Sequence, residues 1–180
     1  GAVLIFDEIV MGFRLRRAGA QEYFGVTPDL AVFAKGISNG VPLSAYLGRA
    51  DIMDAVEKVV ISSTFGGDTL GLAAAGAVLD IYEQEDVIGT LWARGEQLHK
   101  GFATRAESQG IAARFAGLPP VGMLQLPDGV DRIQFEGACL DRGVITFSVY
   151  YPSYSHSEVD IDAALDVMGD ALQQVAYDPV

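Results

Sequence analysis

The hydrophobic residues in the first half of the chain fall into short continuous runs instead of alternating with polar residues. Residues 2–6 (AVLIF) form one run, and residues 30–34 (LAVFA) form another after the turn signal Thr27-Pro28-Asp29. Runs of this length and composition are typical of strands that are buried on both faces in a parallel sheet. The pattern therefore predicts an α/β arrangement in which residues 2–6 form a buried strand.

Helical segments are expected after these strands. Residues 50–60 suit a helix because Asp51 and Asp54 stand near its start, where the helix dipole favours acidic side chains. Residues 62–67 (SSTFGG) are rich in hydroxyl groups and glycine, which indicates a loop. Residues 70–82 are rich in alanine and glycine, and this composition predicts a closely packed, buried helix.

Longer helical stripes mark the second half of the chain. Residues 87–108 and 161–175 each repeat apolar side chains at helical spacing, as expected for helices with one face in a core. Ser157 and Asp160 precede the second stripe in the pattern of a capping box, with Asp in place of the usual Glu or Gln. The remaining predicted elements are a helix over residues 131–142 and strand-like segments over 110–126 and 144–151. The second half is therefore expected to be an α+β unit.

An acidic cluster separates the two halves. Glu83, Glu85 and Asp86 stand directly before the long helical stripe. We therefore expect a domain boundary at this point, with one domain over residues 1–86 and the other over residues 87–180.

Charge excludes some classes of partner. The 180-residue chain has 24 acidic and 12 basic residues, a net charge of -12. An acidic surface repels phosphate backbones and anionic lipids, so no nucleic acid or membrane partner is expected. The uncharged stretches over residues 69–79 and 143–157 are shorter than the roughly 20 apolar residues that a membrane helix needs.

The cysteine and the histidines predict no metal site. One cysteine, Cys139, allows no internal disulfide, so a reducing cytoplasm is the simplest compartment. We interpret Cys139 as a small core residue. His99 lies in a charged helical stretch, where we expect it to be solvated, and His156 is expected to order a turn. These isolated residues do not form the ligand set of a metal ion.

Three polar residues lie at predicted strand-to-loop transitions: Asp7, Lys35 and Thr64. They are 28 and 29 residues apart, and each interval is long enough for an α/β crossover. Ligands bind at the carboxyl ends of strands in open α/β sheets, so the three residues could meet in one cofactor site. Without further context, Asp7 could equally be a capping acid, Lys35 is favoured to be a lysine that reaches to solvent, and Thr64 could belong to a simple hydroxyl turn.

The segments around these residues carry a resemblance to a known family. FDEIVMGFR (residues 6–14), FGVTPDLAVFAKGISNGVPLSAYLGRADIMD (24–54) and STFGGDTLGLAAA (63–75) resemble, in order, the aspartate, lysine and threonine segments of class III, pyridoxal-phosphate-dependent aminotransferases of fold type I. GVITFSVYYPSYSHSEVDIDAAL (143–165) is similar to the C-terminal region of the glutamate-1-semialdehyde aminomutase-like branch. The resemblance implies part of the fold type I large domain, a mainly parallel sheet with helices on both faces, followed by an α+β small domain.

The resemblance also implies roles for four residues. Asp7 would pair with the protonated pyridine nitrogen of pyridoxal 5'-phosphate, which makes the ring a better electron sink. Ile9 would pack on the cofactor ring, and we expect it to share the side of Asp7 at strand period. Lys35 would form a Schiff base with the cofactor aldehyde and then carry a proton during transfer. Thr64 would bind the cofactor phosphate, across the interface of a homodimer.

The implied activity is that of an aminotransferase or a 2,1-aminomutase. It would use a small-molecule amino donor and a carbonyl acceptor. Two alternatives stay open: a racemase or decarboxylase of the same class, and a non-catalytic fragment. The second arises because the family has an N-terminal half with a phosphate-binding turn and an aromatic residue that stacks on the cofactor, and no segment here replaces them. We therefore expect the chain to be the C-terminal part of a longer protein.

Overall fold

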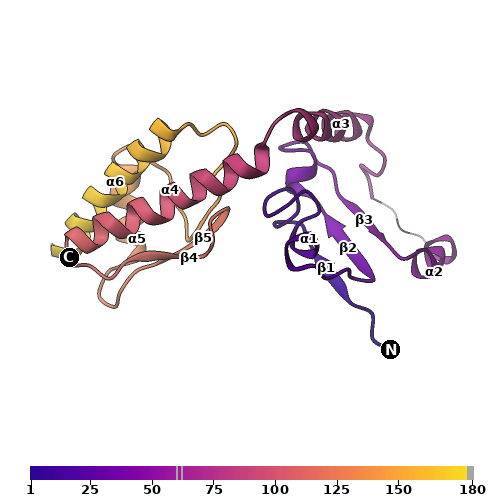
Figure 1. The fold of residues 1–180 in the computed structure, drawn as a ribbon, viewed down its shortest axis with the longest axis horizontal. Coiled ribbons are helices and arrows are strands. Elements are labelled where there is room, and N and C mark those ends of the chain that lie inside the picture. The colour runs from indigo at the N-terminus through magenta and orange to yellow at the C-terminus, as the bar shows by residue number, and fades with distance from the viewer. Residues whose placement is uncertain (60, 62, 178–180) are drawn as a thin grey trace. The chain divides into compact units, whose positions relative to one another are not determined.

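The computed structural model describes residues 1–59, 61 and 63–177, and it contains two compact units (Figure 1). The first unit is Gly1–Ile88 and the second is Gly89–Val180. Each unit has its own sheet. The functional assignment of these units as parts of a large and a small domain, with a division after residue 86, stays a prediction.

The sheet of the first unit has three strands in the order β1-β2-β3. Strand β1 (Ile5–Asp7) runs parallel to β2 (Leu30–Phe33), with Ile5 opposite Leu30 and Asp7 opposite Val32. Strand β3 (Ala45–Gly48) runs antiparallel to β2. The parallel pair matters most for function, because it places the carboxyl ends of β1 and β2 at the same edge.

The other elements of the first unit are short helices and one long helix. The helical elements in chain order are α1 (Ala20–Phe24), η1 (Lys35–Ile37), α2 (Ala50–Met53), η2 (Asp54–Lys58) and α3 (Thr69–Gln84). The helix expected over residues 50–60 begins where predicted but continues as the 3-10 turn η2. It gives way to extended backbone at Val59, as expected for a β-branched residue. Val60 lies outside the described residues.

Two burial predictions for the first unit are wrong. Val3, Leu4 and Ile5 are 52%, 45% and 57% exposed, although the apolar run predicts a buried strand. The strand begins only at Ile5, and among the described residues β1 pairs with a strand on one side, β2. In α3 the buried residues are Gly71 and Ala75, whereas Tyr82 is half-buried and four other large side chains are exposed. These are Leu70, Leu72, Leu79 and Ile81.

The second unit packs helices on an antiparallel sheet in the order β4-β5-β6. Its strands are β4 (Arg114–Leu118), β5 (Val121–Gln125) and β6 (Val149–Tyr150). Its helices are α4 (Val87–Ser108), which enters from the first unit, α5 (Arg132–Leu140) and α6 (Glu158–Tyr177). Pro119 and Pro120 form the turn between β4 and β5, at the break that the sequence indicates.

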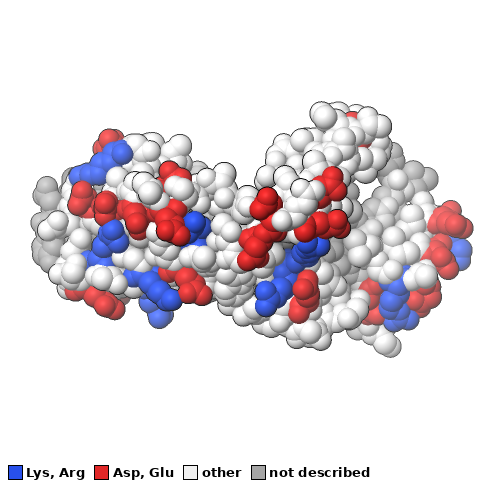
Figure 2. Space-filling model, turned by 45° about the horizontal axis from the view of Figure 1, so that its top comes forward, with Lys and Arg blue, Asp and Glu red and all other residues white. Residues whose placement is uncertain are grey.

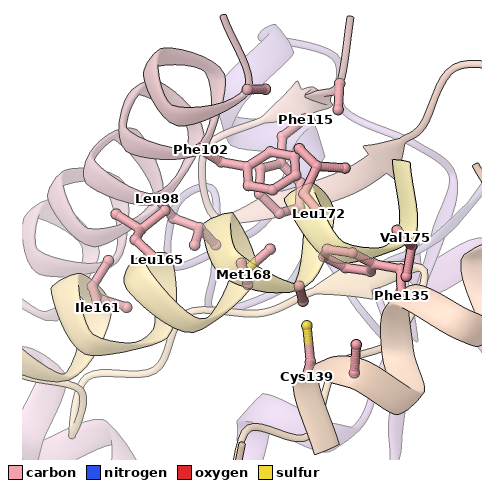
Figure 3. Close-up of a cluster of buried hydrophobic side chains, with 14 residues drawn as sticks. Leu98, Phe102, Phe115, Phe135, Cys139, Ile161, Leu165, Met168, Leu172 and Val175 are labelled. Atoms are coloured by element: carbon pink, nitrogen blue, oxygen red, sulfur yellow. The ribbon is translucent and has the colours of Figure 1, made fainter. Parts of the chain in front are cut away.

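The predicted helical stripes form the core of the second unit (Figure 3). Leu98 and Phe102 of α4 meet Leu165 and Leu172 of α6, and Phe135 of α5 closes the cluster. Phe102, Phe135 and Leu172 are completely buried. The periodic patterns over residues 87–108 and 161–175 are therefore confirmed as core-facing sides of helices.

Cys139 belongs to this core, as predicted. The thiol is completely buried among the hydrophobic side chains. Burial raises the pKa of Cys139 to about 11, because a thiolate is poorly stabilised away from water. The cysteine therefore has the properties of a packing residue.

The capping box before α6 is confirmed. The Ser157 hydroxyl accepts from the Asp160 amide at 3.2 Å, and the Asp160 carboxylate accepts from the Ser157 amide at 2.8 Å. These reciprocal bonds satisfy two amides of the first helical turn. The Ser157 hydrogen bonds lower the pKa of Asp160, because they stabilise the ionised carboxylate.

The expectation that His99 is solvated is wrong. Its ring stacks on Phe115 with centroids 5.1 Å apart and an interplanar angle of 15°. Burial lowers the pKa of His99, because the imidazolium loses hydration against the sheet. His99 lies among charged residues in the sequence, but its side chain faces β4.

Candidate functional site

Asp7 and Lys35 lie at the same edge of the sheet in the first unit. Asp7 is the last residue of β1 and pairs with Val32, while β2 ends at Phe33, two residues before Lys35. Both side chains are exposed. An acid and an amine therefore stand at the carboxyl ends of adjacent parallel strands, where open α/β sheets bind ligands.

The backbone at Lys35 has an unusual conformation. Its φ is 48°, in the left-handed region, directly after an extended Ala34. Its carbonyl accepts hydrogen bonds from the amides of Ser38 at 3.3 Å and Asn39 at 2.8 Å. A left-handed backbone costs a residue with a side chain roughly 1–2 kcal/mol. Strain of this kind persists only where surrounding contacts hold it, and it concentrates at functional sites.

A side-chain hydrogen bond within the loop stabilises the segment after Lys35. The Ser38 hydroxyl donates to the Val41 carbonyl at 2.5 Å, and Ser38 is 3% exposed. Asn39 is also left-handed, with φ 44°. This turn closes the end of β2 and fixes the direction in which the chain leaves Lys35.

Asp7 is fixed by the turn that follows it. One of its carboxylate oxygens accepts from the Ile9 amide at 3.0 Å, the geometry of an Asx turn. Strand β1 ends at Asp7, so Ile9 is a turn residue. The strand-period argument for placing Ile9 on the side of Asp7 is therefore wrong, although Ile9 is half-buried beside it.

Glu8 is a structural residue that the sequence reasoning missed. It is completely buried, and its carboxylate accepts from the amides of Ala20 at 2.9 Å and Gln21 at 2.8 Å. These are amides of the first turn of α1, which need partners and attract a negative charge. The pair of acids at residues 7–8 was the available signal: one faces solvent and the other ties the following loop to α1.

Asp29 holds the beginning of β1. Its carboxylate accepts from the Leu4 amide at 2.8 Å and from the Arg49 guanidinium at 2.7 Å. Two hydrogen bonds lower the pKa of Asp29. The larger effect comes from the Leu4 amide, and the smaller one comes from the Arg49 guanidinium. These contacts fix the start of the strand that ends at Asp7.

Thr64 lies in an exposed turn before α3. Asp68 caps this helix by accepting from the Leu70 amide at 3.2 Å. A Cβ at Gly71 would lie 2.9 Å from the Pro42 carbonyl, so the first turn of α3 touches the loop that follows Lys35. Among the described residues, no hydrogen bond joins Thr64 to Asp7 or Lys35. Ser62, the first residue of the predicted hydroxyl-rich loop, lies outside them.

The described residues contain neither a metal-binding cluster nor a membrane-spanning helix. Within residues 1–59, 61 and 63–177, no cluster of histidine, cysteine and acidic side chains could hold a metal ion. In the same part of the chain, every helix is too short or too polar to cross a bilayer. Figure 2 shows acidic side chains spread over the visible surface of both units, with basic ones among them.

The fold is that of fold type I pyridoxal-phosphate-dependent transaminases. A structure of the PLP internal aldimine form of the Sphingopyxis sp. MTA144 FumI protein matches with a TM-score of 0.91 and 27% identity, over 99% of this chain and 44% of that protein. The profile of the family described as aminotransferase class-III matches residues 1–172. The chain belongs to this family.

Curated relatives are similar over almost the whole chain. The glutamate-1-semialdehyde 2,1-aminomutase of Thermomicrobium roseum is 33% identical over 98% of this chain and 46% of its own length. The enzyme of the same name from Syntrophobacter fumaroxidans is 34% identical over 97% of this chain and 45% of its own length. The chain thus spans about half the length of the curated relatives that it matches.

Proposed function

We propose that this chain supplies the lysine and the acid of a pyridoxal-phosphate site in an aminotransferase or a 2,1-aminomutase. The observation that carries the proposal is the placement of Asp7 and Lys35 at the carboxyl ends of adjacent parallel strands, with Lys35 held in a left-handed backbone. A carboxylate and an amine are the groups that a pyridine ring and an aldehyde require. Membership of the aminotransferase class-III family supports the same cofactor.

Four residues have defined tasks in this proposal. When bound, pyridoxal phosphate supplies an electron sink. The Asp7 carboxylate holds the proton on the pyridine nitrogen, and Ile9 contacts the ring. The Lys35 Nζ binds the cofactor aldehyde and afterwards moves a proton at the substrate carbon that bears the amino group. The Thr64 hydroxyl donates to the phosphate, from the partner subunit of a homodimer.

The relatives named above favour aminomutase chemistry as the first activity to test. A 2,1-aminomutase moves an amino group within one carbon skeleton, while an aminotransferase passes it to a second carbonyl compound. The substrates proposed are therefore small amino and carbonyl compounds, with glutamate-1-semialdehyde first. The buried free thiol of Cys139 supports a reducing cytoplasm as the compartment.

Lysine variants of the whole protein that carries this chain test the proposal. The chain has three lysines, Lys35, Lys58 and Lys100, so Lys58→Ala is a matched control for Lys35→Ala. We expect Lys35→Ala to lose the visible absorbance of bound pyridoxal phosphate and the conversion of glutamate-1-semialdehyde. Lys58→Ala keeps both. Equal cofactor absorbance in the two variants would show that Lys35 is not the attachment point.

A ¹⁵N-labelling experiment separates the two activities. Labelled glutamate-1-semialdehyde is mixed with an unlabelled carbonyl acceptor, and the products are analysed by mass spectrometry. Retention of the label in an isomer of the substrate identifies an aminomutase. Appearance of the label in the aminated acceptor identifies an aminotransferase.

A further inference from the structure

Phe13 has a backbone conformation that its side chain does not favour. It lies in the loop between β1 and α1 with φ 63°, and it is 8% exposed. A bulky residue in the left-handed region is a genuine outlier, whereas glycine takes this conformation readily. Something in the surrounding structure must therefore hold Phe13 in place.

Tyr82, near the end of α3, provides part of that restraint. Its hydroxyl donates to the Phe13 carbonyl at 2.5 Å across 69 residues of sequence. Burial raises the pKa of Tyr82, so the hydroxyl keeps the proton that it donates. Arg17, in the same loop as Phe13, donates from its guanidinium to the Tyr82 carbonyl, so the loop and the helix end are joined at two points.

The ring of Phe13 links Tyr82 to the end of β2. It packs edge-to-face on Tyr82 with centroids 5.6 Å apart, and on Phe33 with centroids 6.1 Å apart. Phe33 is the last residue of β2 and stands two residues before Lys35. Phe13 and Phe33 form a small buried cluster with Ala31, and the partly buried side chains of Tyr82 and Ile37 pack against it.

Phe13 also touches the residue that follows Lys35. A Cβ added at Gly36 would lie 3.2 Å from the Phe13 Cβ and 3.3 Å from the Gly12 carbonyl. Phe13 therefore contacts the chain on both sides of Lys35: Phe33 before it and Gly36 after it. The loop of residues 12–13 therefore packs directly against the strained turn at Lys35.

We propose that Tyr82 is a positioning residue for Lys35. By holding the Phe13 carbonyl and ring, it keeps the loop of residues 12–13 against Gly36 and so fixes the left-handed turn that directs the Lys35 side chain. This inference rests on the proposed function, since the direction of Lys35 matters only if Lys35 binds the cofactor. Tyr82, near the end of α3, would thus act on Lys35 through Phe13 and would not itself contact the cofactor.

Tyr82→Phe in the whole protein tests the proposal. This variant keeps the ring that packs on Phe13 and removes only the hydroxyl donor. Tyr46→Phe is the control, because Tyr46 is 45% exposed on β3 and lies outside the cluster. The measurements are the affinity of the cofactor-free protein for pyridoxal phosphate, followed by visible absorbance, and the pH midpoint of that absorbance in the loaded protein.

Loss of one neutral hydrogen bond predicts a roughly 2- to 12-fold weaker affinity for pyridoxal phosphate in Tyr82→Phe. The pH midpoint should shift as well, because the Lys35 nitrogen changes its surroundings. A merely structural role would lower the unfolding temperature of the cofactor-free protein and leave the pH midpoint unchanged. An unchanged midpoint in Tyr82→Phe would therefore overturn the proposal.

Gly36→Ala gives a second, independent perturbation. The added methyl group pushes Phe13 away by a few tenths of an ångström and removes no hydrogen-bonding group. Gly76→Ala on α3 is its control, because a Cβ there meets nothing within 4 Å. We expect Gly36→Ala to shift the pH midpoint in the same direction as Tyr82→Phe, and Gly76→Ala to leave it unchanged. Identical midpoints in the two glycine variants would contradict the inference.

The wild-type protein distinguishes this inference from the proposed function. If borohydride fixes no cofactor at Lys35 in the wild type, the proposed function fails and the inference fails with it. If the cofactor is fixed at Lys35 and the Tyr82→Phe and Gly36→Ala variants match the wild type, the function stands and the positioning role of Tyr82 is wrong.

Discussion

Replacing Glu8 by glutamine should open the first turn of α1. The buried carboxylate accepts two backbone amides, from Ala20 at 2.9 Å and from Gln21 at 2.8 Å. A glutamine side chain has one carbonyl oxygen, so it can accept from one of these amides while its amino group faces the other. The variant therefore loses at least one charge-assisted hydrogen bond without changing the volume of the side chain.

The expected increase in the amide exchange rate follows from the free energy that such a hydrogen bond contributes. A hydrogen bond to a charged group contributes about 1.5–3 kcal/mol. If opening of α1 exposes these amides, their exchange with solvent should speed up by roughly 10- to 140-fold. The effect should be confined to α1 and the loop before it, because Glu8 contacts the start of that helix.

Hydrogen–deuterium exchange read by mass spectrometry measures this directly in a peptide that covers Ala20 and Gln21. Glu22→Gln is the matched control, because Glu22 is exposed and accepts one bond, from the Ala18 amide at 3.0 Å. The control should change exchange far less, since solvent replaces an exposed bond readily. Equal exchange in the Glu8 and Glu22 variants would refute the assignment of Glu8 as the buried anchor of α1.

Three further predictions concern the second unit. Phe102→Ala should destabilise it by about 3–5 kcal/mol, because the completely buried ring leaves a cavity; an unchanged unfolding temperature would contradict the packing. Cys139 should resist alkylation at neutral pH until the protein unfolds, because the thiol is buried and its pKa is raised to about 11; rapid labelling of the folded protein would oppose this. Asp160 has a lowered pKa in the folded state, so the stabilisation from its cap is present above the ordinary carboxyl pKa and is lost as pH falls through the lowered value. Amide exchange at the start of α6 should rise over that acidic range in the wild type, and an Asp160→Asn variant should not show this pH dependence.

The sequence predicts the second unit better than the first. From Leu98 to Ala106 and over residues 161–175, the stripes bury their apolar faces in the core of the second unit, so local periodicity is enough to predict them. The buried strand predicted from the apolar run over residues 2–6 is wrong for the described chain, because the strand begins only at Ile5 and pairs with another strand on one side. Burial of a strand depends on which strands flank it, and periodicity carries no information on that point.

In the candidate site too, some features can be predicted from local sequence and others depend on tertiary contacts. The glycines around Lys35 indicate a turn, and the spacing of Asp7 and Lys35 is compatible with adjacent parallel strands. The left-handed backbones of Phe13 and Lys35 depend on contacts from α3 and from the loop before α1. Their conformation could not be predicted from local sequence, because residues with large side chains adopt it only when tertiary contacts hold them.

Borohydride reduction of the whole protein loaded with pyridoxal phosphate, followed by peptide mapping, tests the central claim most directly. The account predicts that one peptide gains the mass of the reduced cofactor and that the modified residue is Lys35. An adduct on Lys58, on Lys100 or on a lysine outside this chain, or no adduct at all, would contradict the claim that Lys35 is the residue that binds the cofactor.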